Sequence, residues 1–202
     1  MAITAQQVKA LRDTTGAGMM ECKTALTEAN GNIEEAVTIL RKRGMAQAAR
    51  RSGRTTSQGI VGSYIHLGGK IGVLVEVNCE SDFVARTEDF QHLVKNIAMH
   101  VAAQDPKYVR REDIPSDVLD KERAIYRAQF EGSGKPAQVI DKIVEGKLGT
   151  FYAQVALLDQ PFVRDPNMTV GQLVVQATAK TGENISVSRF ARFKVGEAPE
   201  SA

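Results

Sequence analysis

The residues best suited to chemistry in this sequence are three histidines and two cysteines, and they are scattered along the chain. His66, His92 and His100 do not form the HExxH pattern of a zinc-binding helix, and Cys22 and Cys79 form no CxxC pair. The nucleophile motif GxSxG and the phosphate motifs GxxxxGK[ST] and GxGxxG are absent. The acidic residues suggest no general acid–base pair. The sequence therefore predicts no enzyme, metal site or cofactor, and favours a binding or regulatory protein.

The segment at residues 71–86, IGVLVEVNCESDFVAR, has the strongest pattern for a binding surface. Its first half alternates apolar and other residues with period two, which predicts a strand. Polar, turn-prone residues follow at 78–82, and Phe83 and Val84 come directly after them. A strand that ends in an exposed aromatic side chain would be a hydrophobic probe. Core packing is the common alternative for such a Phe, because Phe is among the most buried residue types.

Composition indicates a globular protein without a membrane segment. The chain has 202 residues, 43% of them hydrophobic and 25% charged, and a formal net charge of only +2. No apolar run approaches the 18 residues of a membrane span, and the N-terminus lacks the apolar region of a signal peptide. We expect a cytoplasmic protein whose two cysteines are reduced thiols.

Residues 1–53 are predicted to form a small domain of three helices. Thr4 and Gln7 have the spacing of a capping box for the first helix, and Asn32 is the expected cap of the third. The second helix is expected at 19–29, with Cys22 among its core residues.

The run at residues 41–54 contains six Lys or Arg and no acidic residue. It is either a solvated helix end that joins two domains or a phosphate-binding patch for RNA. We favour the joint, because no aromatic residue or second basic run accompanies it, as a nucleic-acid groove usually requires. Direct nucleic-acid binding is therefore not expected, and an RNA- or ribosome-binding protein stays the alternative.

Residues 54–202 are predicted to form an α+β core with a mainly antiparallel sheet. Gly68 and Gly69 form the expected hairpin turn between the first two strands. A helical insertion is expected at about 116–158, interrupted at Gly146. The last strand, 184–195, is expected to carry Ile185 and Phe193 on one face.

Several of these segments resemble the elongation factor Ts family over nearly the whole chain. The matching stretches are LR and TGAGMM within 11–20, VEVNC and SDFV within 75–84, IAMH at 97–100 and QPFV at 160–163. At the positions of residues 81–83 the family usually has Thr-Asp-Phe. This chain has Ser81 in place of the Thr, which keeps the hydroxyl group.

The resemblance implies a guanine-nucleotide exchange factor for the translation GTPase elongation factor Tu. The corner, consisting of Ser81, Asp82, Phe83 and Val84, would displace Mg²⁺ from the partner, so that GDP leaves and the nucleotide-free GTPase is stabilised until GTP binds.

The resemblance also implies the other contacts. The N-terminal helices would form a ubiquitin-associated-like domain that binds the GTPase through Arg12, Met19 and Met20, although core packing is an equal alternative for Met19. His66 would face another domain of the partner. Longer members of the family carry the core module twice, so one copy here implies a homodimer. An adaptor that binds a protein without affecting nucleotide is a further alternative.

Overall fold

The computed structural model describes residues 3–197, which form two compact units. The first unit contains the chain up to Val61, Glu76–Val94 and Leu173–Val187. The second unit contains Gly62–Val75, Lys95–Gln172 and the chain from Ser188 onward. The predicted division into a three-helix domain at 1–53 and a core domain at 54–202 stays a prediction.

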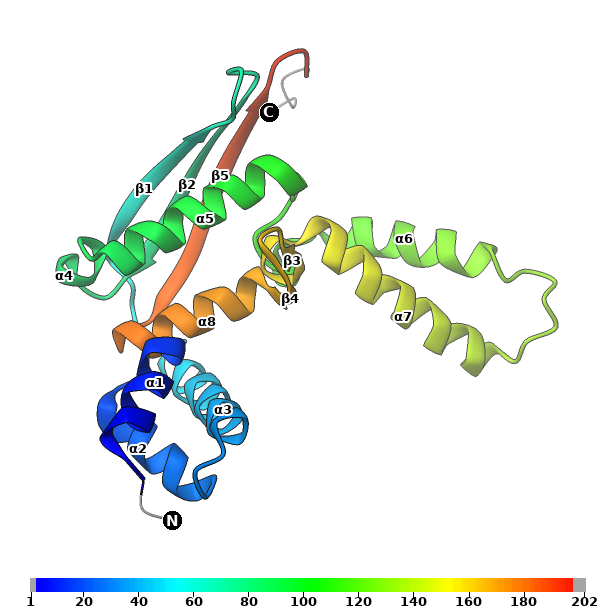
Figure 1. Cartoon of the computed structure of the whole chain (residues 1–202). Coiled ribbons are helices and arrows are strands. Elements are labelled where there is room, and N and C mark those ends of the chain that lie inside the picture. Colours follow the sequence, from blue (N-terminus) through cyan, green and yellow to red (C-terminus); the bar gives the residue numbers. More distant parts are fainter. Residues whose placement is uncertain (1–2, 198–202) are drawn as a thin grey trace. The chain divides into compact units, whose positions relative to one another are not determined.

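The secondary structure confirms the predicted α+β class (Figure 1). A three-stranded sheet has the order β1-β2-β5, and β3 pairs with β4 in an antiparallel ribbon. Within residues 3–197, no helix is long and apolar enough to cross a membrane. In chain order the elements are α1 (Ala5–Thr15), α2 (Met19–Glu28), α3 (Ile33–Arg51), β1 (Gln58–Ile65), β2 (Ile71–Cys79), α4 (Asp82–Ala85), α5 (Glu88–Gln104), η1 (Arg111–Asp113), α6 (Ser116–Ala128), α7 (Ala137–Val155), η2 (Leu157–Asp159), β3 (Pro161–Phe162), β4 (Asp165–Thr169), α8 (Val170–Thr181) and β5 (Ile185–Lys194).

The N-terminal helices begin where their predicted caps lie. The Thr4 side chain accepts from the amide of Gln7, and the Gln7 side chain accepts from the amide of Thr4, which confirms the capping box. Asn32 accepts from the amide of Glu35 at the start of α3. One apolar cluster joins the three helices through Val8, Leu11, Cys22, Ala25, Leu26, Ala29, Ala36 and Leu40. The basic run continues α3 as far as Arg51.

The first two strands approach closely at Gly59. A Cβ atom at this position would lie 2.2 Å from the Val77 carbonyl oxygen, and the φ angle is +149°. Only glycine meets both conditions. On β2, the alternate residues Val73, Val75 and Val77 are buried, as the period-two pattern predicts.

The expectation that Ile185 and Phe193 lie on one face of β5 stays a prediction, but the two residues differ in burial. Ile185 and Val187 are buried, but further along the strand Phe190 and Arg192 are the half-buried residues and Phe193 is exposed. The covered residues therefore change phase after Val187. Arg192 reaches the C-terminal end of α5, and Phe193 is left exposed.

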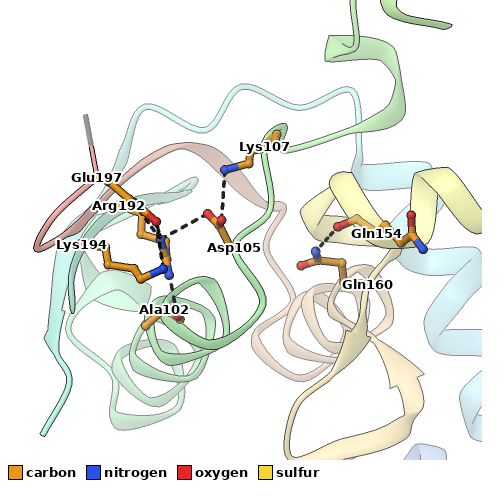
Figure 2. A network of polar contacts seen from close by, with 8 residues as sticks. All are labelled: Ala102, Asp105, Lys107, Gln154, Gln160, Arg192, Lys194 and Glu197. Atoms are coloured by element: carbon orange, nitrogen blue, oxygen red, sulfur yellow. Dashed lines mark hydrogen bonds and ion pairs between the residues drawn. The ribbon is translucent and has the colours of Figure 1, made fainter. Parts of the chain in front are cut away.

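Figure 2 shows Arg192 at the centre of this contact in the second unit. Its Nε donates to the Ala102 carbonyl at 3.4 Å, and its Nη1 lies 3.4 Å from Asp105 and 3.3 Å from Glu197. Asp105 has a positive φ of 47° directly after α5 and also accepts from Lys107 at 3.0 Å. A cation at this position stabilises the free carbonyl groups of a helix end.

The predicted helical insertion is a pair of helices, α6 and α7, that pack on each other. Arg127 donates to Asp141 across the pair at 2.7 Å. The expected interruption at Gly146 is wrong, since α7 is continuous from Ala137 to Val155. Gly146 lies on the exposed side, while Val144 and Leu148 are buried one turn apart, and their packing offsets the low helix propensity of glycine.

His100 joins two of the stretches that carried the family resemblance, in the second unit. The Val163 amide donates to its Nδ1 at 3.2 Å, so its Nε2 carries the hydrogen that is donated to Gln160 Oε1 at 2.9 Å. The amide nitrogen of Gln160 then donates to the Gln154 carbonyl at 2.7 Å (Figure 2). Burial lowers the pKa of His100, and the hydrogen bond with Gln160 opposes this effect.

This arrangement predicts a loss of stability in mild acid. The pKa of His100 in the folded protein lies below the ordinary value of 6.5, so as the pH falls through 6.5 the unfolded chain takes up the proton first. The free energy of unfolding, measured by urea titration between pH 7.5 and 5.5, should therefore fall. His100→Gln should weaken this fall, whereas His92→Gln, on the exposed side of the same helix, should keep it. Equal pH slopes in the wild type and His100→Gln would contradict the assignment.

Candidate functional site

The loop between α1 and α2 presents the first group of predicted binding residues in the first unit. Arg12, Met19 and Met20 are all exposed, and Met20 is 71% exposed. The alternative that Met19 is a core residue is therefore wrong. Flexible thioether side chains adapt well to the surface of a partner.

A short set of hydrogen bonds shapes this loop. Gly16 ends α1 with a φ of +69°, and its amide donates to the Arg12 carbonyl at 2.7 Å. The Thr15 hydroxyl donates to the Leu11 carbonyl at 2.7 Å. The loop thus turns within a few residues, which leaves Arg12 exposed just before the turn and the methionines exposed just after it.

The second group lies at the end of β2, where α4 makes a single helical turn. Ser81 caps this turn and accepts from the Val84 amide at 3.4 Å, and Asp82 accepts from Arg86 at 2.7 Å. The Phe83 side chain is 80% exposed, while Val84 is half-buried. Core packing of Phe83 is therefore excluded. Ser81, Asp82, Phe83 and Val84 are called the corner below.

A half-buried polar cluster supports the corner. Glu183, in the turn after α8, accepts from the amides of Glu80 at 3.1 Å and Ser81 at 2.9 Å, and from the Ser81 hydroxyl at 2.5 Å. The buried Cys79 thiol donates to the Ser81 carbonyl at 3.1 Å. Burial, and then the charge of Glu183, raise the pKa of this thiol. Cys79 is therefore an unreactive hydrogen-bond donor, and both cysteines are free thiols in the structure.

A second set of contacts links the corner to the end of α3. The Asn184 amide donates to Glu80 Oε1 at 2.6 Å, and its side chain donates to the Arg54 carbonyl at 2.8 Å. Arg54 forms an ion pair with Glu80 at 3.5 Å. Asn184 is only 7% exposed, so these hydrogen bonds satisfy a buried amide.

His66 belongs to the second unit, where it follows β1 and is exposed. Its Nδ1 lies 3.1 Å from the Tyr64 hydroxyl, which orients the ring. The structure thus places the Arg12 loop and the corner in one compact unit and His66 in the other. The roles of all these residues in partner binding stay predictions.

The site residues offer binding surfaces rather than reactive groups. In the part of the chain that the structure describes, no three His, Cys, Asp or Glu side chains gather where they could hold a metal ion. The exposed groups are an aromatic ring, two thioethers and a guanidinium, which suit contact with another protein. Sequence analysis did not single out Glu183, and its only local signal is a place between the end of a helix and the start of a strand.

Comparison with known proteins gives the same family over the whole length. The family model described as Elongation factor TS matches residues 1–197. A protein named Elongation factor Ts from Koribacter versatilis is 61% identical over 100% of this chain and 92% of that protein. Proteins of the same name from Solibacter usitatus and Fervidobacterium nodosum are each 58% identical over 98% of this chain, and 94% and 100% of their own lengths are covered.

Proposed function

Because the chain belongs to the elongation factor Ts family of translation elongation factors, we propose that it is a guanine-nucleotide exchange factor for elongation factor Tu in the cytoplasm. The observation that carries the proposal is the exposed Phe83, on a single helical turn that follows a half-buried polar cluster. The proposal assigns this chain no covalent chemistry and no cofactor.

Exchange of this kind follows from linkage between two ligands of one GTPase. A factor that binds the nucleotide-free form more tightly than the GDP-bound form must weaken GDP binding by the same factor. Phe83, inserted between packed helices of the GTPase, would shift them, because packed interfaces rearrange in discrete steps. Mg²⁺ bridges nucleotide phosphates to the protein in such sites, so its displacement by the corner would release GDP. Ser81, Asp82 and Val84 would shape the contact around the ring.

The energy of one aromatic side chain limits what the corner does alone. Complete burial of a Phe side chain supplies about 1.5–3 kcal/mol, which is about one to two powers of ten in an equilibrium constant. Further contacts are therefore required. We assign them to Arg12, Met19 and Met20, on either side of the loop between α1 and α2, and to His66 in the second unit.

Phe83→Ala should slow GDP release from elongation factor Tu by about one to two powers of ten at saturating factor, because the inserted ring is lost. The fold should be unaffected, since the side chain is exposed. Stopped-flow release of a fluorescent GDP analogue measures this rate. Ile33→Ala, which truncates another exposed apolar side chain of the first unit, should leave it unchanged. A wild-type release rate in Phe83→Ala would refute the insertion mechanism.

Arg12→Ala should act differently, by weakening formation of the complex. A lost interfacial arginine contact typically costs more than 1 kcal/mol at an interaction hot spot, so the Kd for nucleotide-free elongation factor Tu should rise about fivefold or more. Isothermal titration calorimetry measures this Kd. Lys9→Ala removes another exposed cation of α1 and is the matched control. Unchanged affinity in Arg12→Ala would remove this residue from the interface.

The basic run at residues 41–54 gives little support to the RNA-binding alternative. Two of its side chains are engaged within the first unit, where Arg43 pairs with Glu28 and Arg54 pairs with Glu80. A nucleic-acid complex would show affinity that falls steeply with salt, whereas an adaptor would bind elongation factor Tu without changing GDP release. Release assays with the purified partner therefore distinguish the three functions.

We further propose that the chain forms a homodimer through the uncovered face of its sheet in the second unit. Ile65, Leu74 and Phe193 are all exposed there, and Phe193 is 68% exposed. The Ile65 side chain lies over Gly72, where a Cβ would be only 3.1 Å from it, so Ile65 shares the face of Gly72 and Leu74. An exposed apolar sheet face of this kind is typical of a protein interface.

Phe193→Asp should therefore convert a dimer to a monomer, because a charge would have to be buried without a partner at the interface. Light scattering after size exclusion measures the mass. Ile125→Asp, which places the same charge at an exposed apolar position of α6, should remain dimeric. A monomeric wild-type protein, or a dimeric Phe193→Asp variant, would refute this interface.

A further inference from the structure

The corner receives little support from the length of its own helix. Helix α4 contains only Asp82–Ala85, a length at which an isolated helix is unstable. Phe83 cannot fix the turn by packing, since its side chain is 80% exposed. The half-buried Val84 and the buried Ala85 pack the end of this turn, so a further restraint on the ring must act on the backbone that precedes it.

Glu183 supplies this restraint with one carboxylate. Its Oε2 accepts from two consecutive amides, those of Glu80 and Ser81, at 3.1 and 2.9 Å. Its Oε1 accepts from the Ser81 hydroxyl at 2.5 Å. The hydroxyl has one hydrogen, so donation to Glu183 leaves its lone pairs for the Val84 amide that it caps at 3.4 Å. Hydrogen bonds to an ionised acceptor are about twice as strong as neutral ones.

The contact between residues 80–81 and residues 183–184 is reciprocal. While the Glu80 amide donates to Glu183, the Asn184 amide donates to the Glu80 carboxylate at 2.6 Å. Glu183 itself follows Gly182, which has a φ of +78° at the end of α8. The Glu183 amide donates to the Thr181 hydroxyl at 3.4 Å. Two short segments thus hold each other in a fixed register within the first unit.

The same turn also reaches the N-terminal helices. Asn184 donates to the Ser52 and Arg54 carbonyls at 3.4 and 2.8 Å, at the exit of α3. One turn earlier, Ala179 lies against Gly44 of α3, where a Cβ would be 3.1 Å away. The stem of Lys180 covers Gly16, at the start of the loop that carries the methionines. Residues 179–184 therefore contact the supports of both predicted binding surfaces of this unit.

We propose that Glu183 is a positioning residue of the exchange reaction, which fixes the corner so that Phe83 meets the GTPase in one orientation. The inference rests on the proposed exchange function and adds to it a residue that touches neither the partner nor the nucleotide. Asn184 extends the same restraint to the end of α3.

The first test measures GDP release with Glu183→Ala. The rate at saturating factor should fall about fivefold or more, the lower end of the usual range for coupling between sites. In a Phe83→Ala background the same substitution should change the rate less than about twofold, because Glu183 acts only through the ring. An undiminished additional loss in that background would overturn the proposal. Glu34→Ala, which removes an exposed carboxylate of α3, is the matched control.

The second test is independent of nucleotide exchange. Amide hydrogen exchange of Ser81 should be slow in the wild type and at least about tenfold faster in Glu183→Ala, while the amides of the N-terminal core cluster remain protected. Unchanged protection of the Ser81 amide in Glu183→Ala would overturn the proposed restraint, even if the wild type releases GDP from its partner rapidly. If the wild type does not stimulate GDP release but the Ser81 amide loses protection in Glu183→Ala, the restraint by Glu183 is supported and the proposed exchange function is refuted. Should Glu183→Ala unfold, Ser81→Ala removes the shortest of the three contacts, together with the Val84 cap, and keeps the two amide contacts, so Glu80 should stay protected while the GDP release rate falls.

Discussion

The central constraint on this protein is that an exposed aromatic side chain must be held in place without being packed. Apolar contacts normally fix a Phe, but here they would bury the group that meets a partner. The remaining means is to fix the main chain by directional hydrogen bonds from another segment. Glu183 does this for Ser81, the residue before α4, and the period-two core of β2 fixes the strand that leads to it. The polar cluster that supports the corner is therefore as necessary to the site as the ring.

The energetics require the two surfaces of the first unit to have different tasks. Contacts that are equally strong in the GDP-bound and nucleotide-free complexes raise affinity but do not change GDP release. Only a contact that is better in the nucleotide-free form couples the two ligands. In the proposed mechanism, a rigidly placed ring that displaces helices belongs to the second kind, whereas adaptable methionine side chains belong to the first. Rigidity is thus needed at the corner, and it is not needed at the loop between α1 and α2.

In the second unit, hydrogen bonds of His100 and Arg192 also join segments that are distant in the sequence. His100 is buried, and its two ring nitrogens engage the Val163 amide and the Gln160 side chain, so no polar atom of the ring is left without a partner. Arg192 likewise satisfies the end of α5 through Ala102 and Asp105. In both places a long or aromatic polar side chain joins elements that are distant in the sequence. Such contacts give a unique arrangement that apolar packing alone specifies less well.

The limits of sequence-based prediction follow from this kind of contact. Helices and caps such as Thr4 with Gln7 were predictable, because their signals lie within three or four residues. The corner and the exposed loop were found from their residues and from family resemblance, but neither the exposure of Phe83 nor the inward turn of Arg192 was fixed by local pattern. The burial along β5 was not predicted, because residue types alone do not show which elements cover each part of a strand. Glu183 lies 102 residues from Ser81 and follows an ordinary helix end, so only the folded chain shows that its carboxylate faces two amides and a hydroxyl. Glu183 could not be predicted from the sequence, because its partners lie in a distant segment and are mostly main-chain amides, which every residue except proline has. The same long-range contact with the main chain is what lets Glu183 restrain the corner.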